Sequence, residues 1–371
     1  MLWFLNWILL IWGTQLAFKK FKKRPLTPRT SYPPVSVLKP LKGADEGLFE
    51  NLKSFFELDY PEYELIFSVT NKKDPAVKVV EQLLQIFPQR NTQLLCEKRE
   101  TELNPKINNL LKAYEVARHE IVLISDSNVR AKKDYLKNLL PDLTPRVGII
   151  TAVVAGTHAS SLGGWLEASY LNTFLSRWML LTKQLGFPSV VGKSMLFRKE
   201  TLKRLGGLKT LGSYIAEDYM AGHAIQKLDL KVEFMQSPIP QYIGNYGVNE
   251  FWARHVRWGR IRKSIAPFAF LIEPFFFSGV SGILGASAAS FFWQIHPGLF
   301  FALHLIAWAI LDLFLFSLMD RFSWKSLGAW FLREALALPL WIKILFGNQV
   351  KWRGGDYRLL QGGLLAGEAT P

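Results

Sequence analysis

The stretch EIVLISD at residues 120–126 is almost entirely apolar and ends in an aspartate. A short apolar run of this kind is typical of a strand buried on both faces of a parallel sheet. Three similar runs precede it, at 35–41, 63–70 and 92–98, and each is followed by a segment with helical spacing, at 51–58, 75–87 and 105–117. This strand–helix alternation predicts an α/β fold with a doubly wound, mostly parallel sheet.

The pattern changes beyond residue 150. We expect a long helix over 163–186, which suits either the membrane interface or the interior of the domain. A strand, a helix and a Gly-Gly turn follow over 190–208, then a helix over 213–228 and a closing strand over 231–235. Glu217 and Asp218 fall in the first turn of the helix at 213–228, where the helix dipole alone would favour them.

The 371 residues carry a net charge of +15 and 14% aromatic side chains. Four stretches are strongly apolar: 1–18, 268–293, 298–319 and 327–346. Their lengths are near the ~20 residues that cross a bilayer. The cationic runs, such as KKFKKR at 19–24, flank these stretches, which fits the positive-inside rule better than nucleic-acid binding. We therefore expect a lipid bilayer and no nucleic acid among the partners.

This distribution predicts five segments. They are a transmembrane anchor at 1–18, a basic and Pro-rich linker at 19–34, a globular domain at 35–264, transmembrane or interfacial helices at 265–346 and a tail at 347–371. The charge follows the first apolar run, unlike the charge of a cleaved signal peptide, so we expect an uncleaved anchor. A single cysteine, Cys96, and the lack of any Asn-x-Ser/Thr sequon agree with a domain on the cytosolic face.

Two aspartates lie where parallel strands end, and ligands bind at that edge of such sheets. Asp126 ends the run at 120–126, and Asp74 lies a few residues past the strand at 63–70. Either residue would serve equally well as a turn former or helix cap, and Asp74 stands directly before Pro75. The histidines His158, His223 and His255 have no convincing metal-ligand spacing.

The order of several motifs is more specific than any one of them. It runs from Asp74 through DSN (126–128), GKSMLFRK (192–199), GGL (206–208) and AEDY (216–219) to RHVRW (254–258). This succession resembles the membrane-bound glycosyltransferases of GT-A fold, family 2/21 type, and within them the ceramide glucosyltransferases. Supporting stretches are PPVSVLKPLKG (33–43), NLKSFFELDYPEYEL (51–65), NPKINNL (104–110), YIAEDY (214–219) and WRGGDYRL (352–359). The resemblance covers nearly the whole chain.

The resemblance implies a GT-A, Rossmann-like cytosolic domain that binds a UDP-sugar, most simply UDP-glucose. It places Asp74 beside the base and ribose and Asp126 at the metal–diphosphate position, where oxygen ligands suit Mg²⁺ or Mn²⁺. Many relatives carry a second carboxylate two residues after the first, and here that position is Asn128, a weaker metal ligand. Lys39 and Lys106 are candidate phosphate ligands, although exposed lysine is the ordinary alternative.

The resemblance also implies an inverting reaction on the primary hydroxyl of ceramide. Asp218 is then the general base, and Glu217 beside it favours a raised pKa. Arg254, Arg257 and Trp258 match a (Q/R)xxRW motif that closes over the donor in the family. Taken alone, the motif is more typical of a basic–aromatic collar at a membrane surface.

Several alternatives stay open. A hopanoid or another hydroxylated lipid would serve as acceptor in the same architecture, a polysaccharide synthase shares the motif succession, and a non-enzymatic scaffold would keep the fold. Asp312 lies within an apolar run and either has a function or forms a helix–helix hydrogen bond. Three full crossings after residue 265 would also put the tail opposite the domain, so we expect one stretch to be interfacial or re-entrant. The alternative is that the tail lies on the opposite side and does not serve the site.

Overall fold

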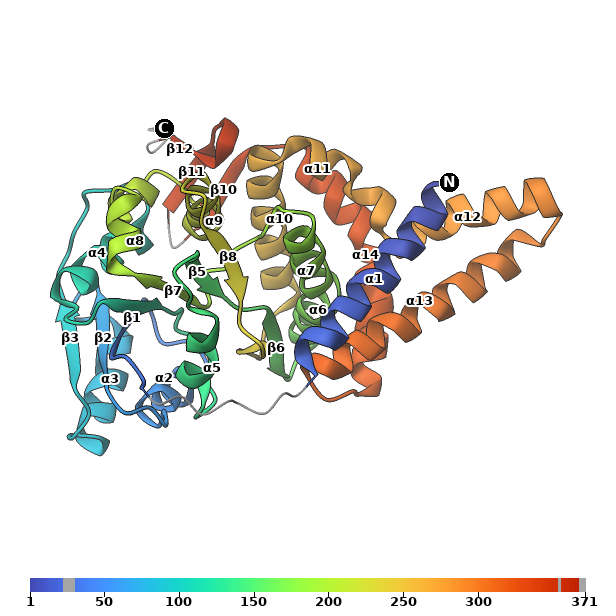
Figure 1. Cartoon of the computed structure of the whole chain (residues 1–371). Helices are drawn as coiled ribbons and strands as arrows, with labels where there is room; N and C mark the ends of the chain where they lie inside the picture. The colour runs from blue at the N-terminus through green and yellow to red at the C-terminus, as the bar shows by residue number, and fades with distance from the viewer. Residues whose placement is uncertain (23–30, 353–354, 367–371) are drawn as a thin grey trace. The chain divides into compact units, whose positions relative to one another are not determined.

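The computed structural model (Figure 1) describes residues 1–22, 31–352 and 355–366. Residues 23–30 of the predicted linker at 19–34, and residues 353–354 and 367–371 of the tail at 347–371, therefore lie outside the described residues. The chain divides into two compact units. The first consists of 1–21, 155–187 and 243–371, and the second of 22–154 and 188–242. This division groups 155–187 and 243–264 with the C-terminal helices. The five segments expected from the sequence, including the domain at 35–264, stay a prediction.

The second unit is built on a seven-stranded sheet with the order β3-β2-β1-β4-β7-β5-β8. Its strands are β1 (Val35–Pro40), β2 (Tyr63–Val69), β3 (Thr92–Cys96), β4 (Ile121–Ile124), β5 (Val147–Thr151), β7 (Met195–Arg198) and β8 (Lys231–Phe234). β7 runs antiparallel to both of its neighbours, while the other pairs are parallel. The prediction of a mostly parallel sheet is confirmed, with β7 as the exception.

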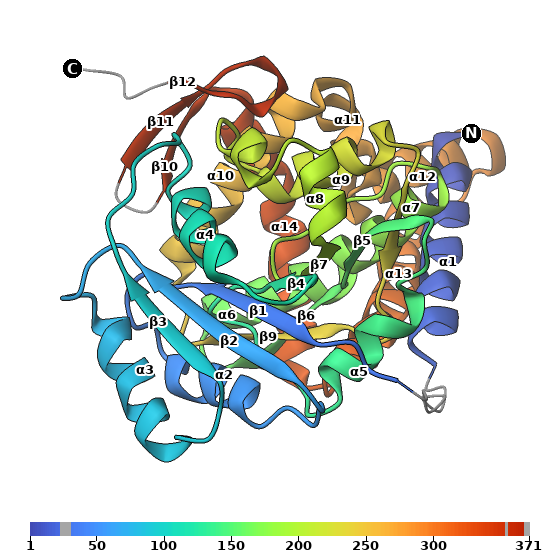
Figure 2. The same ribbon diagram turned by 60° about the vertical axis from the view of Figure 1, so that its left-hand side comes forward.

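Helices cover both faces of this sheet, as a doubly wound fold requires. Figure 2 shows α2 (Leu48–Phe56) and α3 (Pro75–Ile86) on one side of β1–β3 and α4 (Pro105–Val116) on the other. On the α2 side, Phe56 stacks on Phe67 with 5.8 Å between ring centroids. On the α4 side, Leu110 belongs to a fully buried cluster with strand residues such as Ile124 and Phe197.

Shorter elements complete this unit. They are α5 (Tyr135–Leu139), η1 (Leu140–Asp142), α8 (Lys199–Arg204), η3 (Leu208–Leu211), α9 (Glu217–Lys227) and most of β9 (Ile239–Gly244). Strand β6 (Val154–Ala159) follows β5 along the chain and, apart from Val154, belongs to the first unit. Helix α9 begins at Glu217, so Glu217 and Asp218 do occupy a first helical turn, as predicted. The sequence left β5 unassigned, although it is fully buried.

The first unit is mainly helical. Its elements are α1 (Leu2–Phe21), α6 (Leu162–Ser169), η2 (Tyr170–Leu175), α7 (Ser176–Gln184), α10 (Val248–Ile265), α11 (Pro267–Ile272), η4 (Glu273–Phe276), α12 (Ser278–Trp293), α13 (Pro297–Met319), α14 (Trp324–Leu345), β10 (Gln349–Trp352), β11 (Gly355–Leu359), η5 (Gln361–Gly363) and β12 (Leu365–Ala366). The predicted helix at 163–186 is therefore α6 and α7 joined by η2, which is a π-helical segment.

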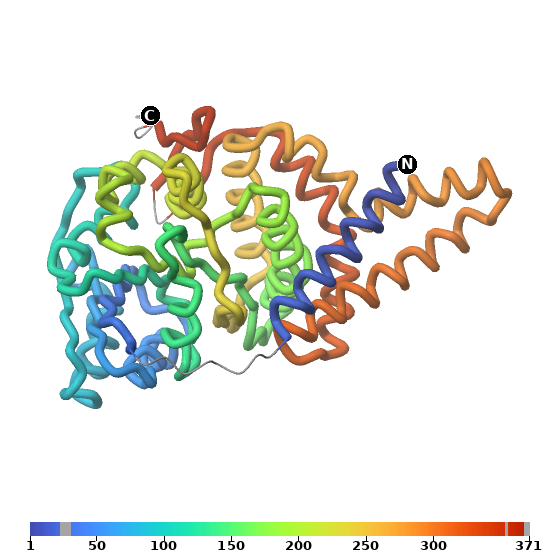
Figure 3. Tube along the Cα trace, in the orientation of Figure 1, coloured from blue at the N-terminus to red at the C-terminus, as the bar shows by residue number. Residues whose placement is uncertain are grey.

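Among the described residues, α13 is the one helix long and apolar enough to cross a membrane by itself. The pair α11–η4 and α12, bent by 60° at a short break, passes the same test if taken together. Figure 3 shows α12 and α13 running beside each other, and α1 packs against both. Ile283, Ile306 and Ile310 leave more than half of their surface exposed along this pair. The predicted anchor at 1–18 stays a prediction.

Asp312 on α13 lies in a buried polar cluster of the first unit. Its Oδ1 accepts a hydrogen bond of 2.5 Å from Arg177 Nη2, and its Oδ2 accepts one of 2.6 Å from Trp330 Nε1. Asp312 is 1% exposed and Arg177 5%. The carboxylate thus joins α7, α13 and α14, which is the helix–helix hydrogen bonding considered from the sequence.

The tail strands pack on α10. Lys263 Nζ donates to the carbonyl oxygens of Ile344 and Gly347, and Arg260 donates to those of Phe346 and Gln349. These bonds satisfy the last carbonyls of α14 and fix the start of β10. Strands β10 and β11 thus lie beside α10, the helix that carries RHVRW.

Candidate active site

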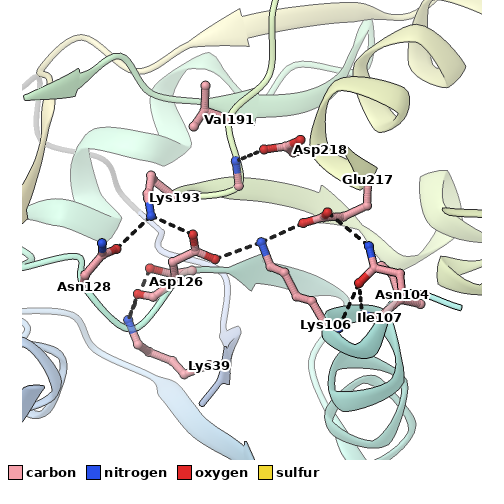
Figure 4. Close-up of polar contacts among 12 residues, drawn as sticks. Lys39, Asn104, Lys106, Ile107, Asp126, Asn128, Val191, Lys193, Glu217 and Asp218 are labelled. Atoms are coloured by element: carbon pink, nitrogen blue, oxygen red, sulfur yellow. Dashed lines mark hydrogen bonds and ion pairs between the residues drawn. The ribbon is translucent and has the colours of Figure 1, made fainter. Parts of the chain in front are cut away.

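Asp126 is the centre of a charged cluster in the second unit. It stands two residues beyond β4, and its two carboxylate oxygens bind different ammonium groups. Oδ1 lies 2.8 Å from Lys106 Nζ, and Oδ2 lies 2.9 Å from Lys193 Nζ (Figure 4). Burial would raise the pKa of this carboxyl, but the two lysine charges outweigh burial and hold the pKa well below its usual range.

The antiparallel register of the sheet explains how Lys193 reaches Asp126. Ile124 on β4 pairs with Met195 on β7. Asp126 lies two residues after its strand and Lys193 two residues before its strand, so the same ladder, continued, sets them opposite each other. Lys193 Nζ also donates to Asn128 Oδ1 at 2.8 Å. Lys193 stands inside the GKSMLFRK motif, but the sequence gave no reason to assign it a role.

Lys106 is positioned by the start of α4. Asn104 caps this helix by accepting hydrogen bonds from the backbone N–H groups of Lys106 and Ile107. Lys106 Nζ lies 2.7 Å from Glu217 Oε1, and Asn104 Nδ2 donates to the other oxygen of Glu217 at 3.3 Å. Burial opposes the charge on Lys106, yet Asp126, Glu217 and Asp218 together raise its pKa. Lys106 is therefore a fixed cation between two acidic residues.

Asp218 follows Glu217 in the first turn of α9 and accepts two backbone hydrogen bonds. The N–H of Gly192 donates to Oδ2 at 2.7 Å, and the N–H of Tyr219 donates to Oδ1 at 2.8 Å. Burial and the neighbouring charge of Glu217 raise the pKa of Asp218 to about 6, against the opposing effects of Lys106 and the two hydrogen bonds. A carboxylate of this kind is ionised near neutral pH and is still able to accept a proton.

Gly192 brings the backbone of the loop before β7 close to this cluster. A Cβ atom at this position would lie 2.6 Å from Lys106 Nζ and 3.3 Å from Asp218 Oδ2. Glycine thus lets the loop approach both groups, and the residue that follows it is Lys193. The site is therefore formed by the residues after β4, the first turns of α4 and α9, and the loop before β7.

Lys39 lies beneath the cluster and is completely buried in β1. Its Nζ donates to the backbone oxygen of Asp126 at 2.8 Å and stands 3.5 Å from the centre of the Phe55 ring. Burial lowers the pKa of Lys39 well below its usual range. Lys39 therefore supports the loop that carries Asp126, and its predicted contact with phosphate stays a prediction.

Asp74 forms the N-cap of α3, which was the structural alternative considered for it. Its Oδ1 accepts from the N–H of Ala76 at 2.9 Å, and both oxygens lie within 3.1 Å of the N–H of Gly43. These bonds tie the loop after β1 to the start of α3. The predicted role of Asp74 beside a nucleotide base stays untested.

Asp126 and Asn128 are the candidate ligands for a divalent cation in the second unit. Asp126 Oδ2 and Asn128 Oδ1 converge on one point, because both bind the same nitrogen of Lys193. Two converging oxygens provide part of a Mg²⁺ site completed by substrate phosphates, but one carboxylate and one amide match only half of the charge of the ion. The point is taken by an ammonium group, and no group of three or more His, Cys, Asp or Glu residues suited to a metal occurs in the described part of the chain.

The RHVRW motif lies on α10, which belongs to the first unit. Arg254 Nε is 3.2 Å from Glu167 Oε1, and its guanidinium stands 4.3 Å from the centre of the Trp258 ring. His255 Nε2 is 2.8 Å from Glu167 Oε2. Because Glu167 is 1% exposed, Arg254 supplies the charge that a buried carboxylate needs, while burial lowers the pKa of His255, which contributes a hydrogen bond. Arg257 is half-buried on the same helix.

The sequence profile of glycosyl transferase family 21 matches residues 1–365. Ceramide glucosyltransferase 3 of Caenorhabditis elegans is 29% identical, and the alignment covers 94% of this chain and 78% of that relative. A ceramide glucosyltransferase of Komagataella phaffii is 26% identical, with 92% and 85% covered. Among solved structures, a mannosyltransferase of Pyrobaculum calidifontis in complex with GDP-mannose and Mn²⁺ has a TM-score of 0.51 at 18% identity, over 93% of this chain and 99% of that one. This likeness shows the fold.

Proposed function

Because the chain belongs to glycosyl transferase family 21, we propose that it transfers glucose from UDP-glucose to the primary hydroxyl of ceramide. The curated relatives named ceramide glucosyltransferase support this acceptor and this sugar. The observation that carries the proposal is the cluster of Asp126, Lys106, Glu217 and Asp218, which combines fixed cations with a carboxylate of raised pKa.

Asp218 is the proposed general base. Its carboxylate removes the proton of the acceptor hydroxyl while the hydroxyl oxygen attacks the anomeric carbon. The bond between that carbon and the diphosphate oxygen breaks, and UDP leaves with the bonding electrons. A single displacement of this kind inverts the anomeric configuration. The pKa of about 6 supports this role, since the group is ionised at neutral pH yet basic enough to hold the proton.

The leaving diphosphate needs positive charge, and Lys106 is already held in place to provide it. Asp126 and Asn128 are the residues that would hold Mg²⁺ or Mn²⁺, and such an ion would supply further neutralisation of the leaving group. It would first have to displace the ammonium of Lys193. The resemblance assigns Asp74 and Lys39 to the donor and Arg254, Arg257 and Trp258 to catalysis, and these roles are part of the proposal.

We further propose an integral membrane protein whose catalytic unit faces the cytosol. The apolar surfaces of α12 and α13 and the basic residues after α1 support this location. A site at a bilayer surface suits a lipid acceptor, because the lipid can enter with its hydrocarbon chains still in the membrane.

The test uses the full chain in lipid nanodiscs with UDP-glucose and, in separate reactions, ceramide, diacylglycerol or a hopanoid. Mass spectrometry identifies the glycolipid, and NMR of the anomeric proton reports the configuration. We expect β-glucosylceramide from the wild type, none from Asp218→Asn, and an unchanged rate from Glu81→Gln, an exposed carboxylate on α3. Product from another lipid alone would refute the acceptor, and product from Asp218→Asn would refute the base.

A further inference from the structure

Lys193 is a buried cation that the sequence motifs did not assign. Its side chain is 11% exposed, and its ammonium binds both Asp126 Oδ2 and Asn128 Oδ1, as Figure 4 shows. These are the two oxygens that a metal ion would use. We propose that Lys193 is the resident cation of the donor site, that it binds the donor diphosphate directly, and that donor binding requires no divalent ion. This inference rests on the proposed nucleotide-sugar donor.

Charge balance favours an ammonium at this position. A pair of two aspartates carries two negative charges and matches a divalent ion, whereas Asp126 and Asn128 carry one. A single ammonium neutralises one carboxylate and gains a hydrogen bond to the amide oxygen. A divalent ion at the same point would keep half of its charge uncompensated by protein and would have only one anionic ligand from the pair. The charge of Lys193, on the loop before β7, therefore matches the single charge of the Asp126–Asn128 pair, on the loop after β4.

The backbone also holds Lys193 in place. It follows Gly192, whose N–H is bound to Asp218, and it precedes β7, which is paired with β4. The ammonium is thus carried by a loop fixed at both ends, and no large movement is needed to keep it beside Asp126. A cation held in this way needs little reorganisation when charge develops on a leaving group.

Lys193 and Lys106 share the single carboxylate of Asp126, one on each oxygen. Lys106 also lies 2.7 Å from Glu217 Oε1, so its charge is divided between two carboxylates, whereas Lys193 binds one carboxylate and the amide oxygen of Asn128. Asp126, Lys106 and Lys193 all keep part of their side chains exposed, at 24%, 15% and 11%. A diphosphate that reached this opening would meet two fixed ammonium groups, each able to form charge-assisted hydrogen bonds with phosphate oxygens.

The test measures UDP binding to the full chain in nanodiscs by calorimetry, either with EDTA or with millimolar Mn²⁺, and needs no acceptor lipid. Electron paramagnetic resonance measures the binding of Mn²⁺ alone. The variants are Lys193→Met, which keeps the length of the side chain, and Lys203→Met, a control at an exposed lysine on α8. Thermal unfolding of each variant shows whether it is folded.

We expect the wild type and Lys203→Met to bind UDP equally well with EDTA and with Mn²⁺. Lys193→Met should bind UDP at least about tenfold more weakly in EDTA, the loss expected for a charge-assisted hydrogen bond. Mn²⁺ should restore its affinity and give a bound-ion signal that the wild type lacks.

Wild-type binding of UDP that requires Mn²⁺ would overturn the inference and leave the proposed function intact. Unchanged UDP affinity of folded Lys193→Met in EDTA would overturn it as well. If the wild type binds no UDP under either condition, the proposed donor is wrong and the inference is refuted with it.

Discussion

Asp218→Asn should make the folded protein more stable at alkaline pH while it abolishes transfer. The folded state raises the pKa of Asp218 from its usual 3.8 to about 6, so the ionised carboxylate is less stable in the site than in the unfolded chain. Between these two pH values the unfolded chain has released the proton that the folded protein retains. The unfolded state then binds fewer protons, and the contribution of Asp218 to stability falls as pH rises.

The size of the effect follows from the shift in pKa. A shift of about two units is worth about 3 kcal/mol at pH 8, and about half of that at pH 5, where the folded carboxyl is mostly protonated. Asparagine removes this cost but offers one oxygen to the two backbone donors of Gly192 and Tyr219, a loss of about 1 kcal/mol. We therefore expect a net gain of about 2 kcal/mol at pH 8 and close to none at pH 5.

The measurement is thermal or denaturant unfolding of the wild type and Asp218→Asn at both pH values, in the same nanodiscs. Glu81→Gln, which removes an exposed carboxylate from α3, is the matched control and should change stability at neither pH. A stability difference between Asp218→Asn and the wild type that does not grow with pH would refute the reasoning. So would a variant that is less stable than the wild type at pH 8.

Two further predictions concern buried charges in the first unit. Arg254→Ala should lower the free energy of unfolding by about 3 kcal/mol, because it removes an ionic partner of buried Glu167. Arg257→Ala should lower transferase activity without a comparable loss of stability. Unfolding and transfer assays on both variants separate the two effects, and equal losses of stability would contradict the prediction. Asp312→Ala should lower the free energy of unfolding by about 3 kcal/mol or more, because it leaves Arg177 buried without its carboxylate partner. An unchanged melting temperature would count against a structural role for this cluster.

The strands β1 to β4 and the helices α2 to α4 were predictable because each has a clear period and clear ends. Pro75 and Pro105 stand at the first positions of α3 and α4, with Asp74 and Asn104 as their caps. The direction of β7 was not predictable in this way. MLFR at 195–198 has the composition of a strand, but only the pairing with β4 and β5 makes it antiparallel.

The π-helical segment Tyr170–Leu175 was also missed. Its residues have the same helical spacing and composition as those of α6 and α7 on either side, so an apolar helix over 163–186 was the natural prediction. The change of hydrogen-bond pattern within that helix depends on tertiary contacts, which periodicity does not report.

The candidate site was found in part. Asp126 was singled out by its position at a strand end, Asp218 by the family resemblance of the AEDY motif, and Lys106 was named as a candidate phosphate ligand. Lys193 was overlooked because lysine is usually exposed, and no local signal distinguishes a buried one. The pairing of Asn104 with Glu217 was invisible for a similar reason, since the two residues are 113 positions apart and meet only in the folded chain.

The antiparallel pairing of β4 with β7 also has a consequence for how the sequence evolves. It sets positions 126 and 128 against position 193, although 65 to 67 residues separate them along the chain. A mutation that placed aspartate at 128 would add a negative charge beside the ammonium, and one that removed the lysine would leave the aspartate unbalanced. Selection would then act on the loops as a pair, so the residues at 128 and 193 should change together as lineages of this family diverge.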